Sequence, residues 1–284
     1  MPSEEAFEEA YSRLRAKRER LLASRLAGDH RRLLASYQSA LTAGEKVAGK
    51  RAMAKFRAEI TDHLHRDMLR SAKESASMVN ARLPQKLRLT VDEEAKLAKS
   101  IGRFAERNAA KAGAAISRTN EKVMRRSHVI ASQEAAKLKR KGVVMPKRNV
   151  HAIATAHAEA NFTARVPQMA ELHVGTAMEH GKVDATEVAL GPNVIQARKR
   201  WDSKGDDKVR DSHLAADSQE VRVSEPFRVG SSLLMYPGDA SLGAPIEERA
   251  NCRCRAFFFP EQVERLRAAR VAQQGLRSAT KEAA

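Results

Sequence analysis

Two cysteines near the end of the chain, together with an aspartate and a histidine earlier in the chain, could bind one metal ion. Cys252 and Cys254 are separated by one residue, and Asp211 and His213 have the same spacing. On a strand, side chains two residues apart point to the same face of the sheet. Two thiolates, an imidazole and a carboxylate would then form a tetrahedral set that suits zinc. The candidate ligands of this predicted zinc site are Asp211, His213, Cys252 and Cys254.

The same residues have two other interpretations. Reduced cysteines pack as small apolar side chains in a core, and His213 would then hydrogen-bond to an acid such as Asp207 or Asp211. A cysteine, a histidine and an acid can also form a nucleophile and its base. No phosphate-binding loop or oxyanion-hole motif accompanies them. We therefore expect no enzymatic activity and no required cofactor, with zinc as the alternative.

Five short motifs of uncommon residues follow one another between residues 199 and 254. They are Lys199-Arg-Trp201, Asp207-Lys-Val-Arg210-Asp-Ser-His213, Glu225-Pro-Phe227, Tyr236-Pro237-Gly238-Asp239 and Asn251-Cys252-Arg-Cys254. The large side chains Trp201, Phe227 and Tyr236 are expected to form the hydrophobic centre of a small domain. The alternative is that Trp201 is exposed and anchors a partner.

This ordered series resembles the phage Mu F-like minor head proteins, a family also described by its phage head morphogenesis domain. The resemblance covers about residues 148–258. One position departs from the family pattern. After His213 the family has Asp-Gly-Gln, whereas this chain has Asp217-Ser218-Gln219. Glycine adopts a positive φ freely and serine does not, so the family's turn geometry is not assured here, although Asp and Ser are both common in turns.

The resemblance implies a structural protein of a tailed-phage or prophage head that acts in head assembly and in the packaging or delivery of DNA. Such a protein lies inside the virion near the portal and is made in the host cytoplasm. The implied partners are the portal protein and other capsid-interior proteins, with no membrane. Two alternatives stay open: an ejected, non-specific DNA-binding protein, and a metal- or thiol-dependent enzyme or toxin built on this domain.

The elements that must position these motifs are mostly helices. Ala, Lys, Arg, Glu and Leu prevail before residue 140, and apolar residues recur at helical spacing. We expect helix breaks at Gly28-Asp29, Ala43-Gly44 and Leu83-Pro84. Thr90-Val-Asp-Glu93 fits a capping box that opens a helix running to about Arg140.

After residue 181 short strands are expected, at 194–201, 220–223, 227–229 and 253–259. The chain thus divides into a basic α-helical arm (1–145), a compact motif-bearing domain (146–258), and a short C-terminal helix with a frayed tail (259–284). The predicted fold class is mainly α, with an elongated basic helical arm followed by a small α+β domain that contains short β-hairpins.

The charge of the chain is concentrated in its first part. The net charge is +17, and residues 1–165 carry 35 lysines and arginines against 18 acidic residues. Such a surface suits a polyanion such as duplex DNA, and the alternative is an ordinary solvated helical surface. Only 4% of residues are aromatic, which argues against binding by base stacking. The candidate DNA-binding residues are Arg125, Arg126, Lys137, Lys139, Arg140 and Lys141.

Two further classes of protein are not expected from the sequence. No apolar run approaches the length that a bilayer crossing needs. The first ten residues are acidic and lack the basic and apolar regions of a signal peptide.

Overall fold

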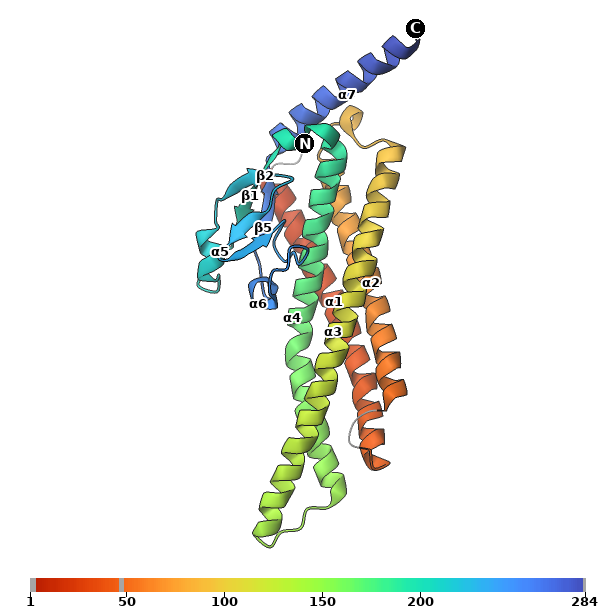
Figure 1. Cartoon of the computed structure of the whole chain (residues 1–284), viewed down its shortest axis with the longest axis vertical. Helices are drawn as coiled ribbons and strands as arrows, with labels where there is room; N and C mark the ends of the chain where they lie inside the picture. Colours follow the sequence, from red (N-terminus) through yellow and green to blue (C-terminus); the bar gives the residue numbers. More distant parts are fainter. Residues whose placement is uncertain (1–3, 46–48, 283–284) are drawn as a thin grey trace. The chain divides into compact units, whose positions relative to one another are not determined.

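The computed structural model describes residues 4–45 and 49–282 and confirms a mainly α fold with a small α+β part (Figure 1). Four long helices come first: α1 (Glu4–Thr42), α2 (Lys50–Ala81), α3 (Val91–Arg140) and α4 (Lys147–Leu190), with a 3-10 turn η1 (Gln85–Leu87) before α3. The remaining elements are η2 (Gly191–Gln196), β1 (Arg198–Asp202), α5 (Asp211–Ala215), β2 (Glu220–Arg222), β3 (Phe227–Val229), β4 (Ser232–Leu234), α6 (Ile246–Arg249), β5 (Arg255–Phe258) and α7 (Pro260–Glu282).

The predicted capping box begins α3. The Thr90 N–H donates to Glu93 Oε2 at 3.1 Å, and the Glu93 N–H donates to Thr90 Oγ1 at 3.3 Å. These two bonds satisfy backbone donors that the first helical turn leaves free. The helix ends at Arg140, as expected, and Gly142 follows with a φ of +80°, the left-handed conformation that commonly terminates helices.

One predicted helix break is wrong. Gly28 and Asp29 lie inside the uninterrupted helix α1. A glycine within a helix costs only about 1 kcal/mol, and the buried Asp29 carboxylate is held by an ion pair with Arg32 and a hydrogen bond with His63 Nδ1 at 2.8 Å. The breaks at Ala43-Gly44 and Leu83-Pro84 do follow the ends of α1 and α2.

The first predicted strand is also partly wrong. Residues 194–196 belong to the 3-10 turn η2, and β1 begins only at Arg198. Gly191 has a φ of +52° and Pro192 lacks a backbone N–H, so the chain leaves α4 through a turn. The C-terminal helix α7 is longer than the predicted short helix and continues to Glu282.

The chain groups into two compact units that do not follow the predicted division at 145 and 258. Unit 1 consists of residues 1–18, 68–104 and 171–284, and unit 2 of residues 19–67 and 105–170. Helices α1 to α4 each contribute residues to both units. The reason is that residues far apart in the sequence pack together where long helices run side by side. A division at fixed points along the chain cannot describe such a unit. Residues 1–145 are therefore not one unit.

Unit 1 contains the small sheets. β1 lies between β2 and β5, all antiparallel, and β3 pairs with β4 in a hairpin. Helix α4 approaches α2 closely at Gly181, where a Cβ atom would lie 2.2 Å from the Ala72 carbonyl oxygen. The buried Arg267 of α7 donates to both carboxylate oxygens of Glu93, at 2.7 and 2.6 Å. The capping-box glutamate thus also anchors the C-terminal helix.

Unit 2 is a helical core with polar contacts at its centre. The Tyr37 hydroxyl donates to the Met124 carbonyl at 2.9 Å. The buried His30 donates from Nδ1 to the Leu26 carbonyl and accepts at Nε2 from the Asn120 amide. Unit 2 carries 23 lysines and arginines against 10 acidic residues, a net charge of +13, whereas unit 1 carries 29 against 25, a net charge of +4. Most of the net positive charge therefore belongs to unit 2.

None of the helices within the described ranges combines the length and the apolar character that crossing a membrane requires.

Candidate functional site

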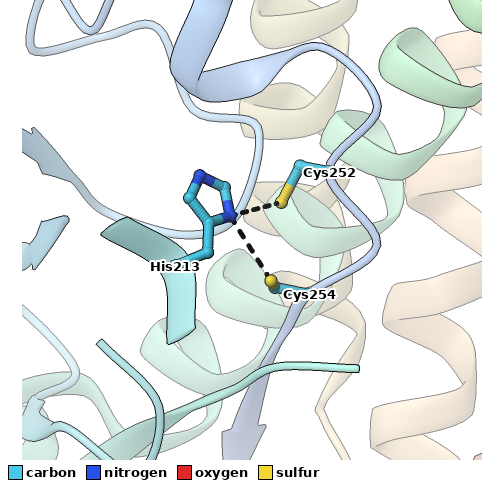
Figure 2. A group of neighbouring side chains, drawn as sticks. All are labelled: His213, Cys252 and Cys254. Atoms are coloured by element: carbon cyan, nitrogen blue, oxygen red, sulfur yellow. Dashed lines mark hydrogen bonds between the residues drawn. The ribbon is translucent and has the colours of Figure 1, made fainter. Parts of the chain in front are cut away.

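Three of the four predicted zinc ligands meet in unit 1. Figure 2 shows the sulfur atoms of Cys252 and Cys254 on the same side of the His213 ring, both directed at its Nδ1 atom. The Nδ1 to Sγ distances are 3.5 Å for Cys252 and 3.4 Å for Cys254. The three potential ligand atoms all lie within 4.8 Å of one another. This group could hold a metal ion.

The other ring nitrogen of His213 sets the orientation of the imidazole. Nε2 lies 2.9 Å from the Glu248 carbonyl oxygen and 3.2 Å from Glu248 Oε2. A carbonyl oxygen only accepts hydrogen bonds, so Nε2 is the donor and, in the neutral ring, Nδ1 presents its lone pair to the sulfurs. The acid beside His213 is therefore Glu248, and the expectation of Asp207 or Asp211 in that place is wrong.

Asp211 does not belong to the group because its segment is helical. Residues 211–215 form the short helix α5, not a strand. Residues two apart in a helix point in nearly opposite directions, so His213 is buried while Asp211 is exposed. Cys252 and Cys254 lie just before β5 and outside any strand, and their sulfur atoms both contact His213 Nδ1.

Several polar contacts fix the loop that carries the cysteines. Asn251 has a φ of 56°, which turns the chain sharply before Cys252. Arg210 donates to the Ala250 carbonyl. Arg253, between the cysteines, donates to Asp206 Oδ2 at 2.6 Å, while the Asp207 of the motif is exposed. The loop is therefore held on both sides of Cys252.

The three groups shift one another's pKa values. The hydrogen bond with Cys254, together with burial, raises the pKa of the Cys252 thiol well above its usual range. The same hydrogen bond lowers the pKa of Cys254. Burial alone lowers the pKa of His213, but the hydrogen bond and the charge interaction with Cys252 outweigh it and raise that pKa. The two thiols and the imidazole therefore titrate as one coupled group.

The aromatic residues of the motifs form the centre of unit 1. Trp201 and Phe227 are fully buried, with ring centroids 5.3 Å apart at an angle of 76°. Tyr236 is 5% exposed and belongs to the same core cluster. The expectation of a hydrophobic centre is confirmed, and an exposed Trp201 that anchors a partner is wrong, because no part of its side chain reaches solvent.

Lys199 is buried beside this core. Its ammonium group donates to the Met235 carbonyl at 2.6 Å and lies 5.1 Å from the centre of the Phe227 ring. Burial lowers the pKa of Lys199 to about 8, against partial compensation by the charges of Glu187, Asp239 and Glu225. The lysine of the first motif is therefore an internal contact of unit 1.

The Tyr236-Pro237-Gly238-Asp239 motif forms a buried turn against α4. Gly238 has a φ of +84°, and a Cβ atom there would lie 2.5 Å from Thr176 Oγ1. Asp239 closes the turn, because its carboxylate accepts from the Met235 N–H at 3.0 Å and from the Ser241 N–H at 2.8 Å. Only glycine fits the space and the conformation at position 238.

The turn that departs from the family pattern keeps a glycine-like conformation. Ser218 has a φ of 60°. Its N–H donates to the Trp201 carbonyl at 2.9 Å, and the Trp201 N–H donates to the Gln219 carbonyl at 2.9 Å. The turn thus holds its geometry through contacts with β1, although serine stands where the family has glycine.

The six candidate DNA-binding residues are all exposed and belong to unit 2. Arg125 forms an ion pair with Glu121 at 2.7 Å, one turn earlier on the helix. Lys137, Lys139 and Arg140 occupy the last turn of α3, where positive charge also stabilises the helix dipole. Their exposure leaves them available to a polyanion.

The sequence did not predict several residues that contact this site in space but lie far from their partners along the chain. Glu248 orients His213, Asp206 holds Arg253, and Arg15 of α1 donates to the Cys252 carbonyl at 3.2 Å. Another is Glu179 of α4, which accepts from the Tyr11 hydroxyl and from the Ala256 N–H. No local pattern marks any of these four residues, because their partners lie between 35 and 237 positions away.

Comparisons with models of known families, with curated proteins and with solved structures found no match to this chain.

Proposed function

We propose that the chain is a minor structural protein of a tailed-phage or prophage head, which acts by binding during head assembly and the packaging or delivery of DNA. The observation that supports this most is the convergence of motifs that are separate in the sequence. Trp201, Phe227, Tyr236, Cys252 and Cys254 contribute to one buried core cluster. Residues that resemble a family signature and also build one core favour a shared domain over a chance match.

In this role the two units have different partners. Unit 1, which carries the motifs and little net charge, contacts the portal protein or other proteins of the capsid interior. Unit 2, with its net charge of +13, contacts packaged duplex DNA through its phosphates. The protein would then lie inside the virion near the portal. We propose no catalytic residue, and zinc is the only cofactor that we propose for the chain.

A second candidate is an internal virion protein that is ejected with the DNA. The concentration of charge in unit 2 favours this candidate, because phosphate contacts alone suffice for non-specific binding. The two roles differ in whether the protein stays in the head.

The proposal is tested by measuring the protein composition of phage particles from a host that encodes this chain. We expect the full-length chain in purified DNA-filled heads, cross-linked to the portal protein, and still present after the DNA has been released. Its presence in full heads and absence from emptied ones would favour the ejected protein. Particles that assemble and contain DNA without the chain would contradict both roles.

A further inference from the structure

We propose that His213, Cys252 and Cys254 bind a single zinc ion in unit 1, with water as the fourth ligand. The proposal concerns a metal site and does not depend on the role in the phage head. Each thiol gives up its proton to solvent as its sulfur binds the metal, so the bound ion faces two thiolates and a neutral imidazole.

The distances between the ligand atoms suit a tetrahedral zinc ion. With Zn–S bonds of about 2.3 Å and Zn–N bonds of about 2.0 Å, tetrahedral angles place a nitrogen and a sulfur about 3.5 Å apart. The observed separations from His213 Nδ1 are 3.5 Å to Cys252 Sγ and 3.4 Å to Cys254 Sγ. Both nitrogen–sulfur separations therefore match a tetrahedral zinc site, and the two sulfurs lie within 4.8 Å of each other.

Hydrogen bonds and a metal ion would satisfy these three ligand atoms in different ways. A neutral imidazole has one acceptor nitrogen with one lone pair in the plane of the ring. Both sulfurs nevertheless lie at hydrogen-bonding distance from the same Nδ1 atom (Figure 2). With a neutral ring, one thiol donates to this lone pair and the other donates elsewhere, as in the hydrogen bond between Cys252 and Cys254, whereas a cation at the centre of the three atoms bonds to all of them.

The surroundings of His213 match those of a metal-bound histidine. Histidine ligands commonly donate their other ring N–H to a carbonyl or a carboxylate, which fixes the tautomer and the ring orientation. His213 Nε2 has both kinds of acceptor in Glu248, at 2.9 Å to its carbonyl and 3.2 Å to its carboxylate. The Ser212 hydroxyl also donates to Glu248 Oε2 at 2.9 Å and holds this carboxylate in place.

The net charge of the occupied site favours burial. Two thiolates balance the charge of a zinc ion, and the imidazole is neutral, so the complex carries no net charge. Cys254 and His213 are 2% and 1% exposed, and Cys252 is 9% exposed. A neutral complex avoids most of the desolvation cost that separate buried ions would carry.

A small hollow adjoins the two cysteines. Within the described ranges, no fourth cysteine, histidine or carboxylate joins the group. Cys252 and Cys254 line a hollow of about 10 Å³ together with Gly175 and Gly238 of unit 1, which is about the volume that a single water molecule needs. Three protein ligands with one exchangeable position is the arrangement of open zinc sites.

The test uses the full-length protein, stripped of metal under reducing conditions and titrated with Co²⁺ and then with Zn²⁺. We expect one Co²⁺ per chain, a thiolate-to-cobalt charge-transfer band, and visible bands of tetrahedral intensity, all lost when one equivalent of Zn²⁺ is added. Zinc should also protect both cysteines from alkylation. The absence of stoichiometric binding, or binding without a thiolate band, would overturn the proposal whatever the outcome of the particle experiment.

Substitutions assign the ligands. Cys252→Ser, Cys254→Ser and His213→Gln should each abolish the stoichiometric tetrahedral signal, while Glu248→Gln, which acts through His213, should weaken binding about 10-fold. The matched control is His157→Gln, since that histidine lies in unit 2 with 42% of its side chain exposed. Circular dichroism identifies variants that fail to fold. A folded Cys252→Ser/Cys254→Ser variant that binds Co²⁺ as tightly as the wild type would contradict the assignment.

Discussion

Ser218 holds a backbone conformation that its side chain disfavours. Its φ of 60° lies in the left-handed region, where a residue with a Cβ atom is less stable than glycine by about 1–2 kcal/mol. The hydrogen bonds to Trp201 keep the turn closed in spite of this cost. Position 218 is therefore one where stability can be gained.

Replacing Ser218 with glycine should raise the free energy of unfolding by about 0.5–1 kcal/mol, because relief of the strain exceeds the added backbone entropy of the unfolded chain. Urea denaturation measures the change. The matched control is Ser224→Gly, an exposed serine of the same domain that is not among the positive-φ residues. That change should lower stability by a few tenths of a kcal/mol. Equal effects at both positions would argue against a strained turn.

Lys199 makes stability depend on pH. Its pKa is about 8 in the folded protein against an ordinary value of 10.5. Between these two values the unfolded chain binds more protons than the folded one, so stability rises with pH across this window. Below about pH 8 the lysine is charged in both states, and the cost of burying its charge is fully present.

The prediction compares the wild type with Lys199→Met, so that other titrating groups cancel. As the pH rises from about 8 to about 10.5, the stability of the wild type relative to the variant should increase by up to about 3 kcal/mol. Denaturant unfolding at a series of pH values measures this difference. A difference that stays flat or falls with pH would show that the ammonium group is not destabilised by burial.

At the scale of elements, the contact between α2 and α4 depends on a single small residue. A Cβ atom at Gly181 would lie 2.2 Å from the Ala72 carbonyl oxygen, a backbone atom that cannot rotate away. Gly102 in α3 has no other atom within 4 Å of its would-be Cβ. Both glycines are helical, so they differ only in the space around them.

Gly181→Ala should destabilise the protein by about 1–3 kcal/mol, because the two helices must separate. Gly102→Ala should stabilise it by up to about 1 kcal/mol through helix propensity alone. Thermal unfolding of the two variants measures the opposite signs. Stabilisation by both alanines would mean that α2 and α4 are not in close contact at Gly181.

Local signals in the sequence predicted much of the secondary structure. The capping box at Thr90 and Glu93, the end of α3 at Arg140 and the strand at 227–229 are confirmed, because each depends on neighbouring residues. The pattern at Gly28-Asp29 misled, since the ion pair of Asp29 with Arg32 on the same helix and its hydrogen bond with His63 of α2 override the local preference for a break.

The candidate site was only partly predictable for the same reason. The spacing of Cys252 and Cys254 indicated a shared face, and His213 stood out as their partner. The prediction of Asp211 as a metal ligand failed because residues 211–215 form the short helix α5, whereas the prediction placed Asp211 and His213 on a strand. Glu248 lies 35 residues from His213, and only the folded chain brings the two together.

At the scale of the whole molecule, the division of charge between the units is the feature with the clearest consequence. Unit 2 carries +13 of the net charge of +17. The units are discontinuous in the sequence, so a fragment ending at residue 145 would contain residues 1–18 and 68–104 of unit 1 without residues 171–284, against which they pack. Binding is therefore to be measured with the full-length chain.

A charge-neutralised variant tests whether the proposed DNA-binding surface lies in unit 2. The variant replaces with glutamine the residues Arg125, Arg126, Lys137, Lys139, Arg140 and Lys141. The control replaces six exposed basic residues of unit 1, namely Lys96, Lys99, Arg103, Lys204, Lys208 and Arg265. Both variants lose the same charge, so a difference between them reports the location of the contacts.

The affinity of the full-length protein for duplex DNA as a function of salt tests the central claim, that the chain acts by binding through unit 2. We predict little sequence preference and a fall in affinity of at least about 10³-fold between about 50 and 200 mM salt if six or more phosphates are contacted. The unit 2 variant should bind more weakly with a shallower salt slope, and the unit 1 variant should resemble the wild type. Equal affinity at both salt concentrations, or equal losses in the two variants, would contradict the account.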